Sequence, residues 1–243
     1  MILAIMTLLI AETFRVHPGW LRHRQGWPGR LTPQCFLLHE SAFWRDRVAT
    51  SSSDHNMDMA DTWFTSDFHF GHFNIIRYCN RPFANTEEMD ACIADRMNAH
   101  VKPNDTLYFL GDFCMGSIEK VAAYRKRLNC KVIHFVEGNH DKVTRKSQSI
   151  FASWSSLSEI HVGKQGIVLC HYAMRVWPHS GRGAWHLYGH SHGNLPDDPL
   201  SLSMDVGVDS HDFCPWHFEE IQVVMQVKGI AREQSSETRV ISE

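Results

Sequence analysis

From residue 61 onward, short apolar runs alternate with amphipathic stretches. Three runs rich in β-branched and aromatic residues are typical of buried strands, at 62–65, 106–110 and 131–136. Between the first two, residues 85–100 place apolar side chains at helical spacing, with Asn85 and Glu88 positioned as an N-terminal cap. Residues 117–127 follow the same period. The pattern therefore predicts strand, helix, strand, helix and strand in that order.

Beyond Trp154 the pattern changes to short strands joined by turns. We predict five of them, at 159–162, 167–170, 185–188, 202–208 and 221–227. Strands that first alternate with helices and then follow one another predict an α/β domain, in which two sheets pack between helices.

Residues 1–60 show neither a sustained helical period nor strand alternation, and they contain arginine but no lysine. We predict a weakly structured extension here, followed by one domain over 61–243. A start-site artefact is the leading interpretation, because Met57 and Met59 directly precede the first strand. A targeting or partner-binding arm is the alternative. The apolar start lacks a positively charged region and Glu12 ends it early, so we predict neither a signal peptide nor a membrane span.

Composition indicates an ordinary globular domain. The chain has 243 residues, 43% of them hydrophobic and 21% charged. A net charge of −3 gives no long-range attraction for polyanions, which disfavours tight non-specific binding of nucleic acid. The seven cysteines include no C-x-x-C pair, which argues against a zinc ribbon and a thioredoxin motif. We interpret them as reduced thiols and predict a cytoplasmic protein with no obligate protein partner.

Five short motifs rich in metal ligands each follow an apolar run. In order they are Asp67-Phe-His69, Gly111-Asp112, Gly138-Asn-His-Asp141, His171 and Gly189-His-Ser-His192. Carboxylate and amide oxygens with imidazole nitrogens, and no thiolate, suit Mn²⁺, Fe²⁺/Fe³⁺ or Zn²⁺. Because ligands gather at the carboxyl ends of strands in layered α/β folds, we expect the motifs to converge and to bind two divalent metal ions.

The five motifs in this order resemble the calcineurin-like metallophosphoesterase superfamily, over roughly residues 61–228. Within it, the chain is similar to a small subgroup common in bacteria and phages. The resemblance implies a four-layer α/β/β/α sandwich of two mixed sheets flanked by helices. It also implies the metal ligands: Asp67, His69 and His192 for one ion, Asn139, His171 and His190 for the other, and Asp112 as the bridge.

The resemblance further implies hydrolysis of a phosphate ester by a hydroxide that bridges the metals. His140 would face the substrate and protonate or stabilise the departing oxygen. Asp141 would hold the ring of His140 in the required tautomer.

Three further residues are candidate substrate contacts: His72, Asn74 and Arg175. His72 and Asn74 could instead cap the following helix, and Arg175 could be an ordinary surface arginine. The aromatic residues Phe73, Tyr78, Trp177 and Trp185 could stack a base, although core or rim packing is the preferred interpretation.

The motifs are closely spaced, which leaves little room for an inserted lid. We therefore expect an open site that accepts a phosphodiester, a nucleotide or a nucleic-acid end. Two alternatives remain at this point. One is a non-catalytic metal-binding scaffold for protein interaction. The other is a protein Ser/Thr phosphatase, although those relatives carry G-D-x-V-D-R-G and G-N-H-E where this chain has Gly111-Asp-Phe-Cys and ends its third motif in Asp141.

Overall fold

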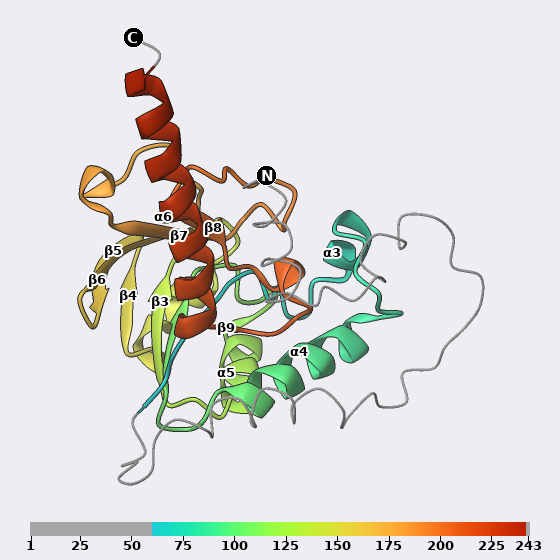
Figure 1. Ribbon diagram of the computed structural model, residues 1–243. Helices are drawn as coiled ribbons and strands as arrows, with labels where there is room; N and C mark the ends of the chain where they lie inside the picture. Colours follow the sequence, from blue (N-terminus) through green and yellow to red (C-terminus); the bar gives the residue numbers. More distant parts are fainter. Residues whose placement is uncertain (1–59, 242–243) are drawn as a thin grey trace, which may run out of the picture. The chain divides into compact units, whose positions relative to one another are not determined.

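Two β-sheets stand at the centre of the computed structural model, which describes residues 60–241 (Figure 1). The predicted extension over 1–60, with Met57 and Met59, lies outside the described residues apart from residue 60.

The first sheet has five strands in the order β4-β3-β2-β1-β9. Their bounds are β1 Thr62–Thr65, β2 Thr106–Phe109, β3 Val132–Val136, β4 Ser153–Ser155 and β9 Trp216–His217. The strands β1 to β4 are parallel and β9 is antiparallel to β1. Since β1, β2 and β3 are the first three predicted strands, the sequence pattern located the centre of this sheet.

The second sheet has four strands in the order β5-β6-β7-β8. Their bounds are β5 Leu157–Val162, β6 Gln165–Cys170, β7 Trp185–Tyr188 and β8 Ser203–Asp205. The strands β6, β7 and β8 are parallel, and β5 is antiparallel to β6. Both sheets are therefore mixed, as predicted.

Two helices pack against the first sheet. They are α4, Thr86–His100, and α5, Ile118–Arg127. The side chain of Asn85 accepts a hydrogen bond from the amide of Glu88, which confirms the predicted cap. Met89, Ile93 and Met97 form the buried face of α4 in a cluster with residues of β2 and β3. The remaining short elements are α3 Phe73–Tyr78, η1 Thr144–Ile150, η2 Ser180–Arg182 and η3 Val208–Ser210.

The predicted strand at 221–227 is wrong. These residues belong to the helix α6, Phe218–Ile241, drawn in red in Figure 1. The β-branched residues of the segment favour a strand, but Ile221, Met225 and Lys228 are buried at the i, i+4, i+7 spacing of a helix face. Here the burial of one helical stripe overrides the local strand propensity.

A buried apolar cluster joins the two sheets. Phe64 and Val136 contribute to it from the first sheet, Leu110 from the position after β2, and Leu169 and Leu187 from the second sheet. Apolar residues of α6 belong to the same cluster. The predicted α/β class with two mixed sheets and helices is thus confirmed. Across the described range, no helix combines the length and the apolar character that crossing a membrane requires.

Candidate metal centre

The predicted ligands lie in loops at the carboxyl ends of parallel strands. The loops after β1, β2, β3, β6 and β7 carry them in chain order: Asp67 and His69, Asp112, Asn139, His171, and His190 with His192. The sheets are connected at this edge by a hydrogen bond from Nδ1 of His171 to the carbonyl of Leu110, 2.7 Å long. A β-bridge between Ser66 and Gly207 adds a second connection. The two sets of loops therefore meet.

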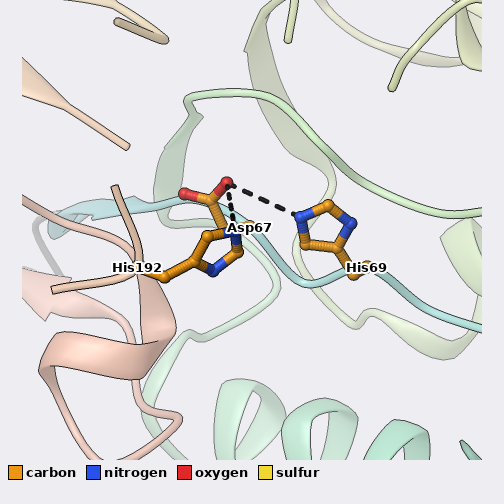
Figure 2. Close-up of side chains that lie close together, drawn as sticks. All are labelled: Asp67, His69 and His192. Atoms are coloured by element: carbon orange, nitrogen blue, oxygen red, sulfur yellow. Dashed lines mark ion pairs between the residues drawn. The ribbon is translucent and has the colours of Figure 1, made fainter. Parts of the chain in front are cut away.

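Asp67, His69 and His192 form a first group of possible metal ligands, whose ligand atoms lie within 4.8 Å of one another. Oδ1 of Asp67 is 3.8 Å from Nε2 of His69 and 3.9 Å from Nε2 of His192. Figure 2 shows dashed lines from one carboxylate oxygen of Asp67 to a ring nitrogen of each histidine. Residues 125 positions apart in sequence (192−67) thus present ligand atoms to one point.

Asp112, His171 and His190 form a second group within the same limit. Asn139 joins this group, because its Oδ1 lies 3.1 Å from Nε2 of His171. All seven predicted metal ligands are consequently found in one of two neighbouring clusters.

Asp112 lies between these clusters. Its Oδ2 is 3.4 Å from Nε2 of His69, in the first group, and 3.5 Å from Nε2 of His171, in the second. A carboxylate has the charge and the lone pairs to serve two cations at once. This position is compatible with the bridging role that the resemblance implies, which stays a prediction.

The backbone at the ligands adopts a conformation that most residues avoid. Asp67, His69, Asp112, His190 and His192 all have positive φ, between 48° and 67°. Asp and His tolerate this left-handed region better than most non-glycine residues, but each instance costs free energy. The fold therefore maintains strain at the ligand positions, which is typical of functional sites.

The motif glycines permit close approach of the loops. A Cβ at Gly138 would lie 2.3 Å from Oδ1 of Asp112, and a Cβ at Gly189 would lie 2.1 Å from Oγ of Ser66. Side chains at these positions would displace Asp112 or the segment that carries Asp67.

Hydrogen bonds on the far side of two histidine rings fix their tautomers. Nδ1 of His171 faces a carbonyl, which can only accept, so this nitrogen carries a proton and Nε2 faces the centre. Nδ1 of His192 is 2.7 Å from Oδ2 of Asp209, and its Nε2 likewise faces Asp67. Such outer partners orient metal ligands and raise their basicity.

The sequence pattern did not identify Asp209. This residue lies in η3, shortly after the carboxyl end of β8, and the only signal for it was an aspartate that follows a strand, as at Asp67 and Asp112. Arg81 is 4% exposed and forms two hydrogen bonds to Asp209, and it also donates to the carbonyls of Asp67 and Phe68. Arg81 therefore supports the loop of Asp67 and the partner of His192 together, and it does not lie on the surface.

Two buried polar atoms face the first group without a hydrogen-bond partner, Oδ1 of Asp67 and Nε2 of His69. Unpaired buried polar atoms are costly in free energy, and a bound cation would satisfy both. Burial raises the pKa of Asp67 to about 7, because the carboxylate is removed from water. These observations fit a divalent metal at this position.

The electrostatics of the second group point the same way. Burial alone would raise the pKa of Asp112, but the hydrogen bond and charge of His171 lower it to about 2. Burial lowers the pKa of His171, but its contact with Asp112 raises it to about 8. In the absence of a metal, the proton on His171 supplies the positive charge that Asp112 requires. A metal ion would replace that proton.

Asp141 has partners that differ from the prediction. Its Oδ2 accepts hydrogen bonds from the amides of Gly138 and Asp112, and its Oδ1 accepts one from the amide of Phe113. The sequence-based role, orienting the ring of His140, is therefore corrected. A fully buried carboxylate has its oxygens occupied by backbone amides, so Asp141 instead holds the second motif against the third.

His140 and His72 line the exposed side of the centre. The ring of His140 is exposed and its centroid lies 5.3 Å from that of His69 and 5.9 Å from that of His72. Nδ1 of His72 is 3.4 Å from Nδ1 of His69. Burial lowers the pKa of His72, which favours a neutral ring. Both predicted residues therefore lie beside the first ligand group, and their roles towards a substrate stay predictions.

Asn74 and Arg175 have exposed side chains. Asn74 belongs to α3, the helix that begins at the residue after His72. Arg175 lies in the segment between β6 and β7. Their predicted contacts with substrate remain predictions.

No protein-family model matches the chain. The uncharacterized protein MJ1445 of Methanocaldococcus jannaschii is 30% identical over 183 residues, which is 72% of this chain and 97% of MJ1445. The Gene 66 protein of Mycobacterium phage L5 is 36% identical over 92 residues, which is 34% of this chain and 41% of that protein.

Among solved structures, the protein of unknown function AQ665 from Aquifex aeolicus matches 68% of this chain and 100% of its own, with a TM-score of 0.55 and 23% identity. This match shows the fold alone. A novel archaeal phosphodiesterase and the phosphoesterase Yfce from E. coli match 60% of this chain each, and 83% and 78% of their own chains. Their TM-scores are 0.38 and 0.35 at 16% and 18% identity, which is too distant to support a functional argument.

Proposed function

Because the chain belongs to the family of the archaeal protein MJ1445 and its five motifs resemble those of the calcineurin-like metallophosphoesterases, we propose that it hydrolyses phosphate esters at a centre for two divalent metal ions. The observation that carries the proposal is the position of Asp112. One of its oxygens lies within 3.5 Å of a ring nitrogen from each ligand group. A carboxylate in this position supports two adjacent cations better than one.

Two bound divalent cations would supply an activated water for attack and would neutralise the phosphoryl oxygens. The residues of the chain would bind the cations and orient the ligands. Asp67, with an otherwise unpaired oxygen, and Asp112 provide the negative charge that retains the cations. Asp209 and the carbonyl of Leu110 keep the rings of His192 and His171 in the orientation that directs Nε2 inward.

We propose that His140 protonates or stabilises the oxygen of the leaving group. Its exposed ring stands beside His69, while its backbone amide donates a 2.8 Å hydrogen bond to Oδ1 of Asp112. This bond fixes the position of the residue relative to the bridge. A histidine here can donate a proton to the leaving group, a contribution typical of general acid catalysis.

We further propose that the substrate is a diester or a nucleotide-type ester. Asn139, His140 and His190 are all exposed, so the centre opens to solvent. An open centre accommodates an ester with groups on both sides of the phosphorus, whereas a small monoester gains most from an enclosed site.

The test combines metal analysis with two chromogenic esters. Purified protein is loaded with Mn²⁺, and turnover of bis-p-nitrophenyl phosphate is compared with that of p-nitrophenyl phosphate. We expect about two bound ions per chain and faster turnover of the diester. The Asp112→Asn variant should bind less metal and lose at least about a hundredfold in turnover. Asp95→Asn, an exposed aspartate on α4, is the matched control.

A protein that binds the metals but hydrolyses neither ester would support the non-catalytic scaffold instead. Turnover of the monoester alone would overturn the diester assignment while leaving the hydrolase in place.

A further inference from the structure

An exposed tyrosine borders the second ligand group. Tyr172 follows the ligand His171 directly and is 46% exposed. Its ring centroid lies 4.8 Å from that of His190 and 5.1 Å from that of His171, edge-on to both. A phosphate bound between the ligand groups would therefore have this aromatic ring near one of its substituents.

The backbone that carries Tyr172 is held by a buried histidine. Nδ1 of His186 is 3.1 Å from the carbonyl of Val168, and its Nε2 is 3.1 Å from the amide nitrogen of Met174 and 3.2 Å from the carbonyl of Tyr172. Burial lowers the pKa of His186, which favours a neutral ring. Trp177 packs against the same ring, at 5.4 Å between centroids. Tyr172 thus projects from a fixed segment, which lowers the entropy lost when a ligand stacks on it.

A second exposed tyrosine borders the first ligand group. Tyr78, at the end of α3, is 67% exposed, and its ring is edge-on to His72 at 6.5 Å. His72 in turn contacts the ligand His69. Asn74 lies one helical turn before Tyr78, on the same face of α3. Each ligand group therefore has one exposed tyrosine near it. On the side of the first group, the side-chain amide of Asn74 lies on the same helix face as Tyr78.

We propose that the ester cleaved here joins nucleosides, and that Tyr172 and Tyr78 stack the bases on the two sides of the phosphate. The inference rests on the proposed hydrolysis and names its substrate class. Stacking on aromatic side chains accepts every base, and an amide such as that of Asn74 can contact a base edge. The net charge of −3 provides no long-range attraction for a long polyanion, which favours a dinucleotide or a short single strand over a long one.

The test uses two diesters with the same leaving group. One is the p-nitrophenyl ester of thymidine monophosphate, and the other is methyl p-nitrophenyl phosphate, which has no base. With Mn²⁺, the wild type should prefer the thymidine ester. Tyr172→Leu should lower kcat/KM for the thymidine ester by about tenfold, chiefly through KM, and should change the methyl ester less than about twofold. Tyr172→Phe should retain most of the preference, because the ring remains. For Tyr78→Leu the substrate is a ribonucleotide dimer, which can span both rings, and its cleavage is followed by chromatography. The variant should lower kcat/KM for the dimer by about tenfold and change the methyl ester less than about twofold, and an unchanged kcat/KM for the dimer would overturn the role of Tyr78.

Val176→Ala, in the same segment and 76% exposed, is the control and should change neither ester. Equal loss on both esters in Tyr172→Leu would indicate a structural role and overturn the inference. A wild type that hydrolyses both esters equally would overturn it as well, while leaving the proposed hydrolase intact. If neither ester is hydrolysed, the proposed function itself fails, and this inference with it.

Discussion

Nδ1 of His192 lies 2.7 Å from Oδ2 of Asp209, although neither the spacing nor the motif pattern pairs these two residues. Burial lowers the pKa of His192, but its hydrogen bond to Asp209 and the charge of Asp67 raise it to about 10. Without a metal the ring therefore carries a proton on Nε2 as well. With a metal bound at Nε2, Asp209 would offset the positive charge that develops on the ring as it donates electron density to the ion.

We predict that Asp209→Asn lowers the affinity of the first ligand group for Mn²⁺ by about 10- to 100-fold, because the outer partner of His192 loses its charge. Titration calorimetry on chelator-treated protein measures this. Asp95→Asn is again the control. The variant also removes the ion pair of the buried Arg81, so thermal unfolding without metal must accompany the titration. Unchanged affinity in a folded variant would exclude a positioning role for Asp209.

His140→Ala should retain both metal ions and lose two or more orders of magnitude in turnover, because the ring faces the rim and not a ligand group. Metal content by mass spectrometry and turnover of the diester are the two readouts. The loss should fall on kcat more than on KM. His161→Ala, on the exposed strand β5, should behave as wild type. Loss of metal in His140→Ala would show that the residue has been placed wrongly.

Gly138→Ala should displace Asp112, because the added Cβ would lie 2.3 Å from Oδ1 of Asp112 and 2.7 Å from its amide nitrogen. The backbone amide cannot move away without breaking its hydrogen bond to Asp141. We expect weaker metal binding and a thermal unfolding temperature lowered by several degrees. Gly181→Ala adds the same methyl group where nothing lies within 4 Å, and it should leave both quantities unchanged. Equal effects of the two substitutions would contradict the packing argument.

The raised pKa of Asp67 predicts that the stability of the metal-free protein depends on pH. Burial raises its pKa to about 7, whereas an unfolded aspartate titrates near about 3.9. Between these values the folded state binds more protons than the unfolded state, so Asp67 lowers stability progressively as the pH rises towards 7. The full penalty persists above pH 7.

Asp67→Asn should therefore stabilise the metal-free protein at pH 8 by at most about 4 kcal/mol, with the difference disappearing near pH 4. Addition of Mn²⁺ should reverse the ranking, because only the wild type offers the carboxylate to the ion. Denaturant unfolding at the two pH values, with and without Mn²⁺, measures both effects. A variant that is less stable than wild type at pH 8 without metal would contradict the burial argument.

Short-range patterns account for most of the elements. The strands at β1, β2, β3 and β7 and the capped helix α4 follow from residues that are neighbours in the chain. The segment 221–227 was misassigned because its β-branched residues favour a strand, while the helical stripe of Ile221 and Met225 becomes decisive only when a core is present to bury it. Local propensity is a weak guide where tertiary burial selects between two periods.

The candidate ligands and their order along the chain could be predicted from the sequence, because metal binding favours Asp, Asn and His and because parallel strands bring their carboxyl ends together. The hydrogen-bond partners and neighbours of those residues could not be predicted from the sequence. Asp141 binds backbone amides and not a neighbouring ring, Asp209 reaches His192, and Tyr172 borders His190. Such pairings depend on loop directions and on which side chain is nearest in space, and folding fixes both through contacts between residues distant in sequence. The sequence thus determined the chemistry of the site, and the tertiary structure decided its orientation and its rim.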